Sequence, residues 1–95
     1  MRLEPHQISV IREEVGRLDP AASIYLYGSR ADDAAKGGDI DLLVVSDALQ
    51  FRDLLRLRIA VLDRIGWQKL DLAHRKSGDL KDAVAREAVE TGVRL

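Results

Sequence analysis

Apolar residues recur at two kinds of spacing along the chain, and these predict three helices and three strands. Helical spacing, with apolar positions three and four residues apart, occurs in three stretches, near 5–18, 49–65 and 80–91. Short runs rich in branched and apolar residues, which are typical of strands, lie between the helices at 23–27, 40–45 and 69–73. The chain therefore alternates between the two kinds of element.

Capping and breaking residues mark several boundaries of these elements. Asp19-Pro20 ends the first helix, because the residue before a proline is pushed out of the helical conformation. Asp47, with Gln50 three positions later, predicts the start of the second helix. Ser77-Gly78-Asp79 opens the last helix, and Gly92 closes it.

The predicted order is helix, strand, turn, strand, helix, strand, helix. Residues 29–38 connect the first two strands and leave room for one helical turn after Ser29. Helices that cover one face of a small sheet are the natural packing for such an order. We therefore expect an α+β (α/β) fold, a small mixed β-sheet with helices packed on one face, and a single domain over residues 1–95.

Composition excludes several classes of protein. The chain is 46% hydrophobic and 33% charged, which is typical of a globular domain and not of a disordered one. Its net charge of −1, with both signs mixed, predicts no extensive nucleic-acid surface. The absence of cysteine excludes disulfides and thiolate metal sites. No secretory leader or membrane-length apolar run is present, so we expect a cytoplasmic protein without a membrane contact.

Asp39 and Asp41 are the first candidates for chemistry. Side chains alternate across a strand, so both aspartates project from one face while Ile40 and Leu42 project from the other. Their β-carbons should lie ~7 Å apart along the strand. Carboxylates at this spacing can share two divalent cations, which clamp the attacking and leaving oxygens of a phosphoryl displacement.

Asp71 repeats this pattern on the third strand. Leu70 and Leu72 face one way, and Asp71 faces the other. If the two strands are neighbours with their leucines in the core, Asp71 joins the first two aspartates on the open face. Three crowded carboxylates repel one another unless cations bind them. The alternative is that Asp71 is merely exposed on an edge strand.

Gly28, Ser29 and Arg30 are the candidates for binding a nucleotide. A glycine where a strand enters a turn lets the backbone approach a ligand closely. The N–H groups of Ser29 and Arg30, at the start of a helical turn, and the Ser29 hydroxyl are donors for phosphate oxygens. Arg30 adds positive charge, or pairs with Asp32 or Asp33 instead.

These motifs resemble those of a known superfamily. Gly28-Ser29, Asp39-x-Asp41 and the later Asp71 are similar to the signature of the DNA polymerase β-like nucleotidyltransferases, and the length resembles their minimal, MntA-type branch. The resemblance implies a polymerase β-like fold. It also implies Asp39, Asp41 and Asp71 as catalytic ligands of Mg²⁺, with two ions, and Gly28 and Ser29 as binders of ATP. The chain departs from the family pattern at Asp32-Asp33, where many relatives have a basic residue and a glycine.

The resemblance also implies a partner. Minimal nucleotidyltransferases commonly act as antitoxins that transfer AMP to a tyrosine of a HEPN-domain toxin. The alternative is a binding antitoxin or scaffold whose nucleotide site is vestigial. The 49–65 helix carries more apolar residues than one buried side needs, among them Leu55 and Ile59, and this surplus suggests packing under the last helix, a dimer interface or a toxin interface.

Overall fold

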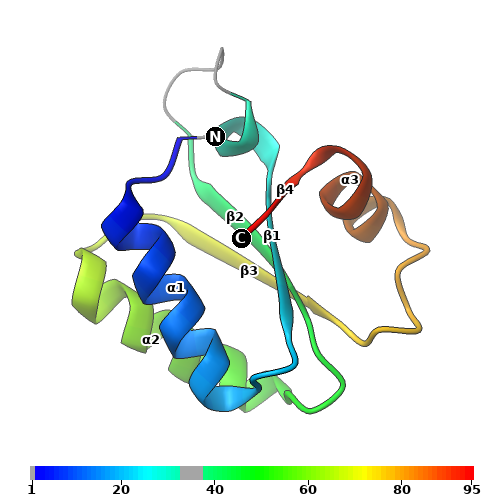
Figure 1. The fold of residues 1–95 in the computed structure, drawn as a ribbon, viewed down its shortest axis with the longest axis horizontal. Coiled ribbons are helices and arrows are strands. Elements are labelled where there is room, and N and C mark those ends of the chain that lie inside the picture. The colour runs from blue at the N-terminus through cyan, green and yellow to red at the C-terminus, as the bar shows by residue number, and fades with distance from the viewer. Residues whose placement is uncertain (1, 33–37) are drawn as a thin grey trace.

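The computed structural model describes residues 2–32 and 38–95, which form three α-helices, four strands and one short 3₁₀ turn (Figure 1). In chain order the elements are α1 (Pro5–Leu18), β1 (Ser23–Tyr27), η1 (Gly28–Ala31), β2 (Ile40–Val45), α2 (Phe51–Ile65), β3 (Leu70–Arg75), α3 (Ala83–Thr91) and β4 (Val93–Arg94). Among these helices, none is both long enough and apolar enough to cross a membrane.

The strands form one mixed sheet in the order β3-β2-β1-β4. β1 runs antiparallel to both β2 and β4, whereas β2 and β3 are parallel. Parallel neighbours need a long connection between them, and α2 supplies it. The α+β architecture with a mixed sheet that we predicted is confirmed.

The main core lies between the sheet and the pair α1 and α2. Alternate residues of the central strands point into it, and Leu26, Ile40 and Leu42 are at most 1% exposed. Ile11 of α1 and Leu57 of α2 meet them from the helical layer and are equally buried. This confirms the predicted alternation along β2, because Asp41 is left on the opposite face, the one that also carries Leu43 and Val45.

α3 packs on the opposite face of the sheet, so the expectation that all helices share one face is wrong for this helix (Figure 1). Ala85 and Ala88 of α3 are fully buried against Leu43 and Val45 of β2. The reason is that β2 is apolar on both faces beyond its aspartates, and the second face needs cover. Small alanines let the helix backbone approach the strand closely.

Two helix starts lie later than the caps we predicted. α2 begins after Gln50, which forms a reciprocal capping box with Asp53. Asp47 instead accepts hydrogen bonds from Ser77, at 2.9 Å to its N–H and 2.7 Å to its hydroxyl. α3 begins after Asp82, whose carboxylate accepts from the helix N-terminus. The side chains expected to start helices thus join the loops before α2 and α3 to each other.

β4 has no counterpart among the predicted strands. It contains only Val93 and Arg94, and it pairs with Leu26 and Tyr25 on the outer edge of β1. A run of two residues is too short for an alternating pattern to reveal it.

Candidate active site

Asp41 and Asp71 lie directly opposite each other on adjacent strands. β2 and β3 pair in parallel with Asp41 in register with Asp71, and the apolar residues on either side of both aspartates pack into the same core. The two carboxyl groups are close enough to share a hydrogen bond. The structure therefore brings together the two strands' carboxylates as the sequence predicted, on the face opposite α1 and α2.

The pKa of Asp41 is raised from 3.8 to about 6. Partial burial is the largest cause, followed by the hydrogen bond with Asp71 and then by the negative charges of Asp71, Asp39 and Glu87. Each of these influences disfavours another negative charge at the site. A bound cation would reverse this preference, because it stabilises the ionised carboxylates.

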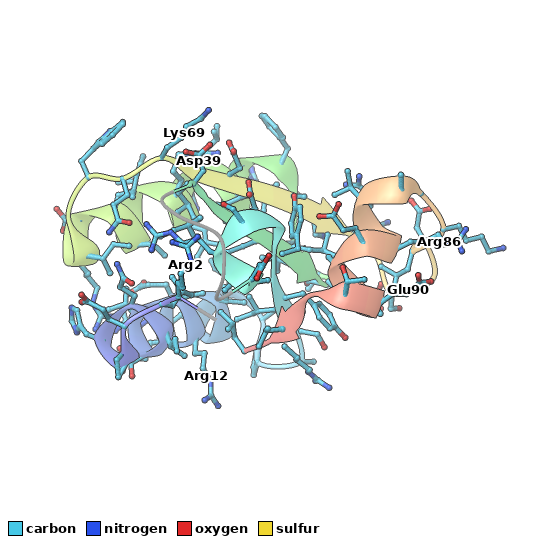
Figure 2. All side chains as sticks on the ribbon, turned by 90° about the horizontal axis from the view of Figure 1, so that it is seen from above. Arg2, Arg12, Asp39, Lys69, Arg86 and Glu90 are labelled. Carbon is cyan, nitrogen blue, oxygen red and sulfur yellow. The ribbon has the colours of Figure 1, made fainter. Side chains whose placement is uncertain are left out.

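Asp39 is paired with a positive charge in this arrangement. Its carboxylate lies 3.3 Å from the ammonium of Lys69, and Figure 2 shows the two side chains together beside the start of β3. The hydrogen bond to Asp39 is the largest cause of the raised pKa of Lys69. Strand alternation places Lys69 on this face, but nothing in the sequence showed that it would contact Asp39. An ammonium thus already neutralises part of the carboxylate charge.

Gly28 brings the turn η1 against these carboxylates. It has a φ of 73°, in the left-handed region that favours glycine. A β-carbon at this position would lie 2.5 Å from Oδ2 of Asp41, which is closer than real contacts allow. Tyr27, just before it, is in register with Asp41 across β1 and β2. The predicted close approach at Gly28 is therefore an approach to the Asp41 carboxylate.

Ser29 and Gly38 lie against each other at the two ends of the connection between β1 and β2. Gly38 has a φ of 95°, and any side chain there would collide with the Ser29 hydroxyl. Since Gly38 immediately precedes Asp39, the Ser29 hydroxyl is placed beside the carboxylate-bearing end of β2. Asp33, one of the two acidic departures from the family pattern, lies outside the described residues.

Arg30 connects the turn to two other segments. Its guanidinium donates to the carbonyl oxygen of Arg2 at 2.9 Å and to that of Gly38 at 3.2 Å. The carbonyl of Arg30 in turn accepts the N–H of Arg2 at 2.8 Å. These bonds fix the ends of the turn, so a structural role is visible for Arg30, while its contact with a nucleotide stays a prediction.

Glu87 and Tyr27 are site residues that the sequence reasoning did not identify. The charge of Glu87, on α3, helps to raise the pKa of both Asp41 and Tyr27. Burial is the largest cause for Tyr27, followed by the charges of Asp41, Asp71 and Glu87. With all helices expected on one face of the sheet, nothing could place Glu87 near the aspartates.

A hollow lies next to the carboxylates, between η1 and α3. Its volume is about 400 Å³, and it is lined by Gly28, Ala31, Asp32, Glu87 and Thr91. Gly28 and Ala31, the first and last residues of the turn predicted to bind phosphate, belong to this lining. The acidic lining favours a ligand that arrives with cations over a bare polyanion.

The carboxylates have the chemistry that Mg²⁺ prefers, since it binds hard oxygen ligands and usually keeps several waters. Among the described residues, no three His, Cys, Asp or Glu side chains already form a group that could hold a metal ion. Ligation by Asp39, Asp41 and Asp71 would therefore need Asp39 to leave Lys69 and the three carboxylates to converge on the ion. The donor set fits the ion, and these side chains are exposed enough to rotate.

The family model of the nucleotidyltransferase domain matches residues 8–93, which include the Gly28 turn and all three aspartates. The chain belongs to the nucleotidyltransferase domain family. None of the curated proteins compared with the chain matches it. Family membership establishes the general reaction, transfer of a nucleotidyl group from a nucleoside triphosphate, which in this family generally involves a divalent metal.

Proposed function

We propose that this nucleotidyltransferase transfers AMP from ATP to a hydroxyl group of another protein, with Mg²⁺ as the metal. The acceptor is a tyrosine of a HEPN-domain toxin, so the chain is the antitoxin of a cytoplasmic toxin–antitoxin pair. The observation that carries the catalytic part is the Asp41–Asp71 pair in register beside the Gly28 turn. The toxin partner rests on the resemblance to minimal nucleotidyltransferases.

In the proposed reaction, the acceptor oxygen attacks the α-phosphorus of ATP. A bond forms between that oxygen and phosphorus, the bond from the α-phosphorus to the bridging oxygen breaks, and pyrophosphate leaves. Mg²⁺ held by Asp39, Asp41 and Asp71 would neutralise the charge that develops on the phosphoryl oxygens. Asp71, the exposed member of the in-register pair, accepts the acceptor's proton.

The turn η1 would position the triphosphate. Gly28 lets the turn lie against the Asp41 carboxylate, and Ser29 beside it offers its hydroxyl and N–H as donors to phosphate oxygens. Arg30 holds the ends of the turn through its bonds to Arg2 and Gly38, which keeps these donors in place before ATP arrives. Preorganised donors of this kind lose little entropy during the reaction.

The direct test follows labelled AMP. The protein is incubated with α-labelled ATP, Mg²⁺ and the HEPN protein encoded beside it, and label on the HEPN protein is measured. We expect transfer by the native chain and at least a ~100-fold slower transfer by Asp39→Asn/Asp41→Asn. Asp79→Asn, an exposed aspartate away from the site, is the matched control and should leave the rate unchanged. Undiminished transfer by the double variant would refute the catalytic assignment.

A second candidate is a binding antitoxin with a vestigial nucleotide site. Two observations favour it: the Lys69 ammonium already pairs with the Asp39 carboxylate, and the raised pKa of Asp41, caused by burial and then by Asp71, disfavours the ionised form that a metal needs. In that case Asp39→Asn/Asp41→Asn would still silence the toxin in cells. The enzymatic proposal requires the double variant to lose protection while it remains folded.

A further inference from the structure

The outer side of α2 carries an apolar stripe that no described part of the chain covers. Phe51, Leu55 and Ile59 follow one another at intervals of four residues, so they lie along one side of the helix. They are 75%, 51% and 69% exposed, although the helix already has a buried apolar side in Leu57 and Val61. The stripe is therefore a second apolar side, and contiguous exposed apolar surface of this kind marks an interaction site.

We propose that this stripe binds the same stripe of a second copy of the chain, with the two α2 helices antiparallel. A two-fold axis brings identical surfaces together, so an apolar stripe is complementary to itself. Rows of side chains four residues apart are also the ridges that interdigitate when two helices pack.

The charged residues of α2 support a second copy as the occupant. Arg64 is already held within the molecule, by Glu14 of α1 at 2.8 Å. Arg52, Arg56 and Asp63 lie on the exposed side and have no hydrogen bond or ion pair within the described part of the chain. Both signs of unpaired charge therefore flank the stripe, with the arginines near the start of the helix and the aspartate near its end.

An antiparallel arrangement matches these charges with their opposites. When the two-fold axis passes between positions 57 and 58, Arg52 and Asp63 are equally far from it along the helix. Arg52 of each copy then lies opposite Asp63 of the other, on the same flank of the stripe. In a parallel pair, Arg52 of one copy and Asp63 of the other would lie at different levels along the helices and on opposite flanks, so these charges would not meet. The antiparallel pair also opposes the two helix dipoles.

The pairing leaves both active sites open. α2 covers the face of the sheet that holds Ile40 and Leu42, while Asp41 projects from the other face. Two molecules joined through α2 therefore present their carboxylates on the outside of the pair. Dimerisation can consequently be tested apart from nucleotidyl transfer.

Sedimentation velocity of the full chain, over about a hundredfold range of concentration, tests the proposal. We expect a reversible dimer that Leu55→Glu weakens by at least about tenfold in Kd, because it places two charges at the centre of the interface. Val89→Glu, at an exposed apolar position on α3, is the matched control and should leave dimerisation unchanged. Trp67, the single tryptophan, is 84% exposed just after α2, so its fluorescence gives a second reading of the association.

Exchange of the flanking charges identifies the occupant. Arg52→Asp alone and Asp63→Arg alone should each weaken the dimer, because each places like charges opposite one another. An equal mixture of the two variants should dimerise again, since every pair then joins opposite charges. Both positions are exposed, so the variants are expected to keep the native circular dichroism spectrum.

Three results would overturn the proposal. The first is a native chain that stays monomeric at every concentration. The second is a dimer that Leu55→Glu does not weaken, since the contact would then lie elsewhere. The third is a mixture of the charge variants that fails to associate. If the chain is monomeric alone and binds a HEPN protein through this stripe, the occupant is that protein and not a second copy.

Discussion

Gly28 has little freedom to accept a side chain, because its α-carbon faces the Asp41 carboxylate at a positive φ. We expect Gly28→Ala to lower the free energy of unfolding by about 2 kcal/mol, through backbone strain and the clash with Oδ2 of Asp41. We also expect at least a tenfold slower nucleotidyl transfer, since the turn must move away. Urea unfolding and the labelled-ATP assay measure the two effects.

Gly16→Ala is the control for that substitution. Gly16 lies inside α1, and a β-carbon there would meet no atom within 4 Å. The free energy of unfolding of this variant should be higher by about 0.5–1 kcal/mol, because alanine favours the helix. The variant should keep full transfer activity. Equal losses in both variants would show that Gly28 has no special contact with the site.

Asp41 makes the stability of the protein depend on pH. Its folded pKa of about 6 lies above the ordinary 3.8, so the folded state binds the proton more tightly than the unfolded state. The free energy of unfolding therefore falls as pH rises from 3.8 through about 6. The shift corresponds to about 3 kcal/mol, which solvent screening of this partly exposed carboxylate reduces to about 1 kcal/mol.

We predict that Asp41→Asn in EDTA is more stable than the native chain at pH 7 by about 1 kcal/mol, and that the two converge below the ordinary pKa. Mg²⁺ should raise the melting temperature of the native chain and have less effect on the variant, since the ion binds the ionised carboxylate. Thermal unfolding across pH, with and without Mg²⁺, measures both. A native chain that gains stability as pH rises through this range would contradict the cause we assign.

For single residues, the sequence predicted the direction of a side chain wherever strand alternation applies. The apolar residues on either side of Asp41 and Asp71 predicted that both carboxylates lie on the face away from the main core, and the register and the core confirm this. Lys69 contacts Asp39 through a side-chain conformation that alternation does not specify. Glu87 lies near the site only because α3 packs on the same face of the sheet as the aspartates. No local sequence pattern specifies the face on which a helix packs.

Among the elements, α3 depends most on a single residue at its start. Asp82 caps the helix, and its carboxylate accepts two bonds of 3.0 Å from the guanidinium of Arg75 at the end of β3. That pairing is the largest cause of the lowered pKa of Asp82, about 2. Because the folded pKa is depressed, the stabilisation is present above the ordinary pKa of 3.8 and is lost as pH falls through about 2.

Two substitutions separate the cap from the charge. At neutral pH the melting temperature should fall in the order native, Asp82→Asn, Asp82→Ala, because asparagine keeps a capping oxygen and alanine keeps neither function. Near the folded pKa, the native chain and Asp82→Asn should melt together. If Asp82→Asn melts with Asp82→Ala at neutral pH, the ion pair with Arg75 accounts for the whole effect.

The existence of the three helices and of β1, β2 and β3 was predictable, whereas β4 and the ends of the helices were not. Both Asp47 and Asp79 stand where a cap is expected, yet the helices begin at later residues whose own caps satisfy the backbone. Several polar residues near each start could cap the helix. Asp47 instead accepts a hydrogen bond from Ser77 in the other loop. Long-range contacts of this kind leave no periodic trace in a sequence.

For the whole molecule, stability depends on the core between the sheet and the pair α1 and α2. Leu42 is 1% exposed there, one position away from Asp41. We expect Leu42→Ala to lower the free energy of unfolding by about 3 kcal/mol, which is a large part of the stability of a chain this small. Leu55→Ala, measured in dilute protein, should change stability by at most about 0.5 kcal/mol because Leu55 is half exposed. Urea midpoints that shift equally would contradict this placement of the core.

β4 also has a consequence for solubility. This two-residue strand is the cover over the outer edge of β1, where it pairs with Tyr25 and Leu26. An uncovered edge strand offers its N–H and C=O groups to another chain, which is how sheets extend into fibrils. A change that detaches Val93 and Arg94 would therefore be expected to appear first as aggregation, before any loss of the helices or of the carboxylate pair.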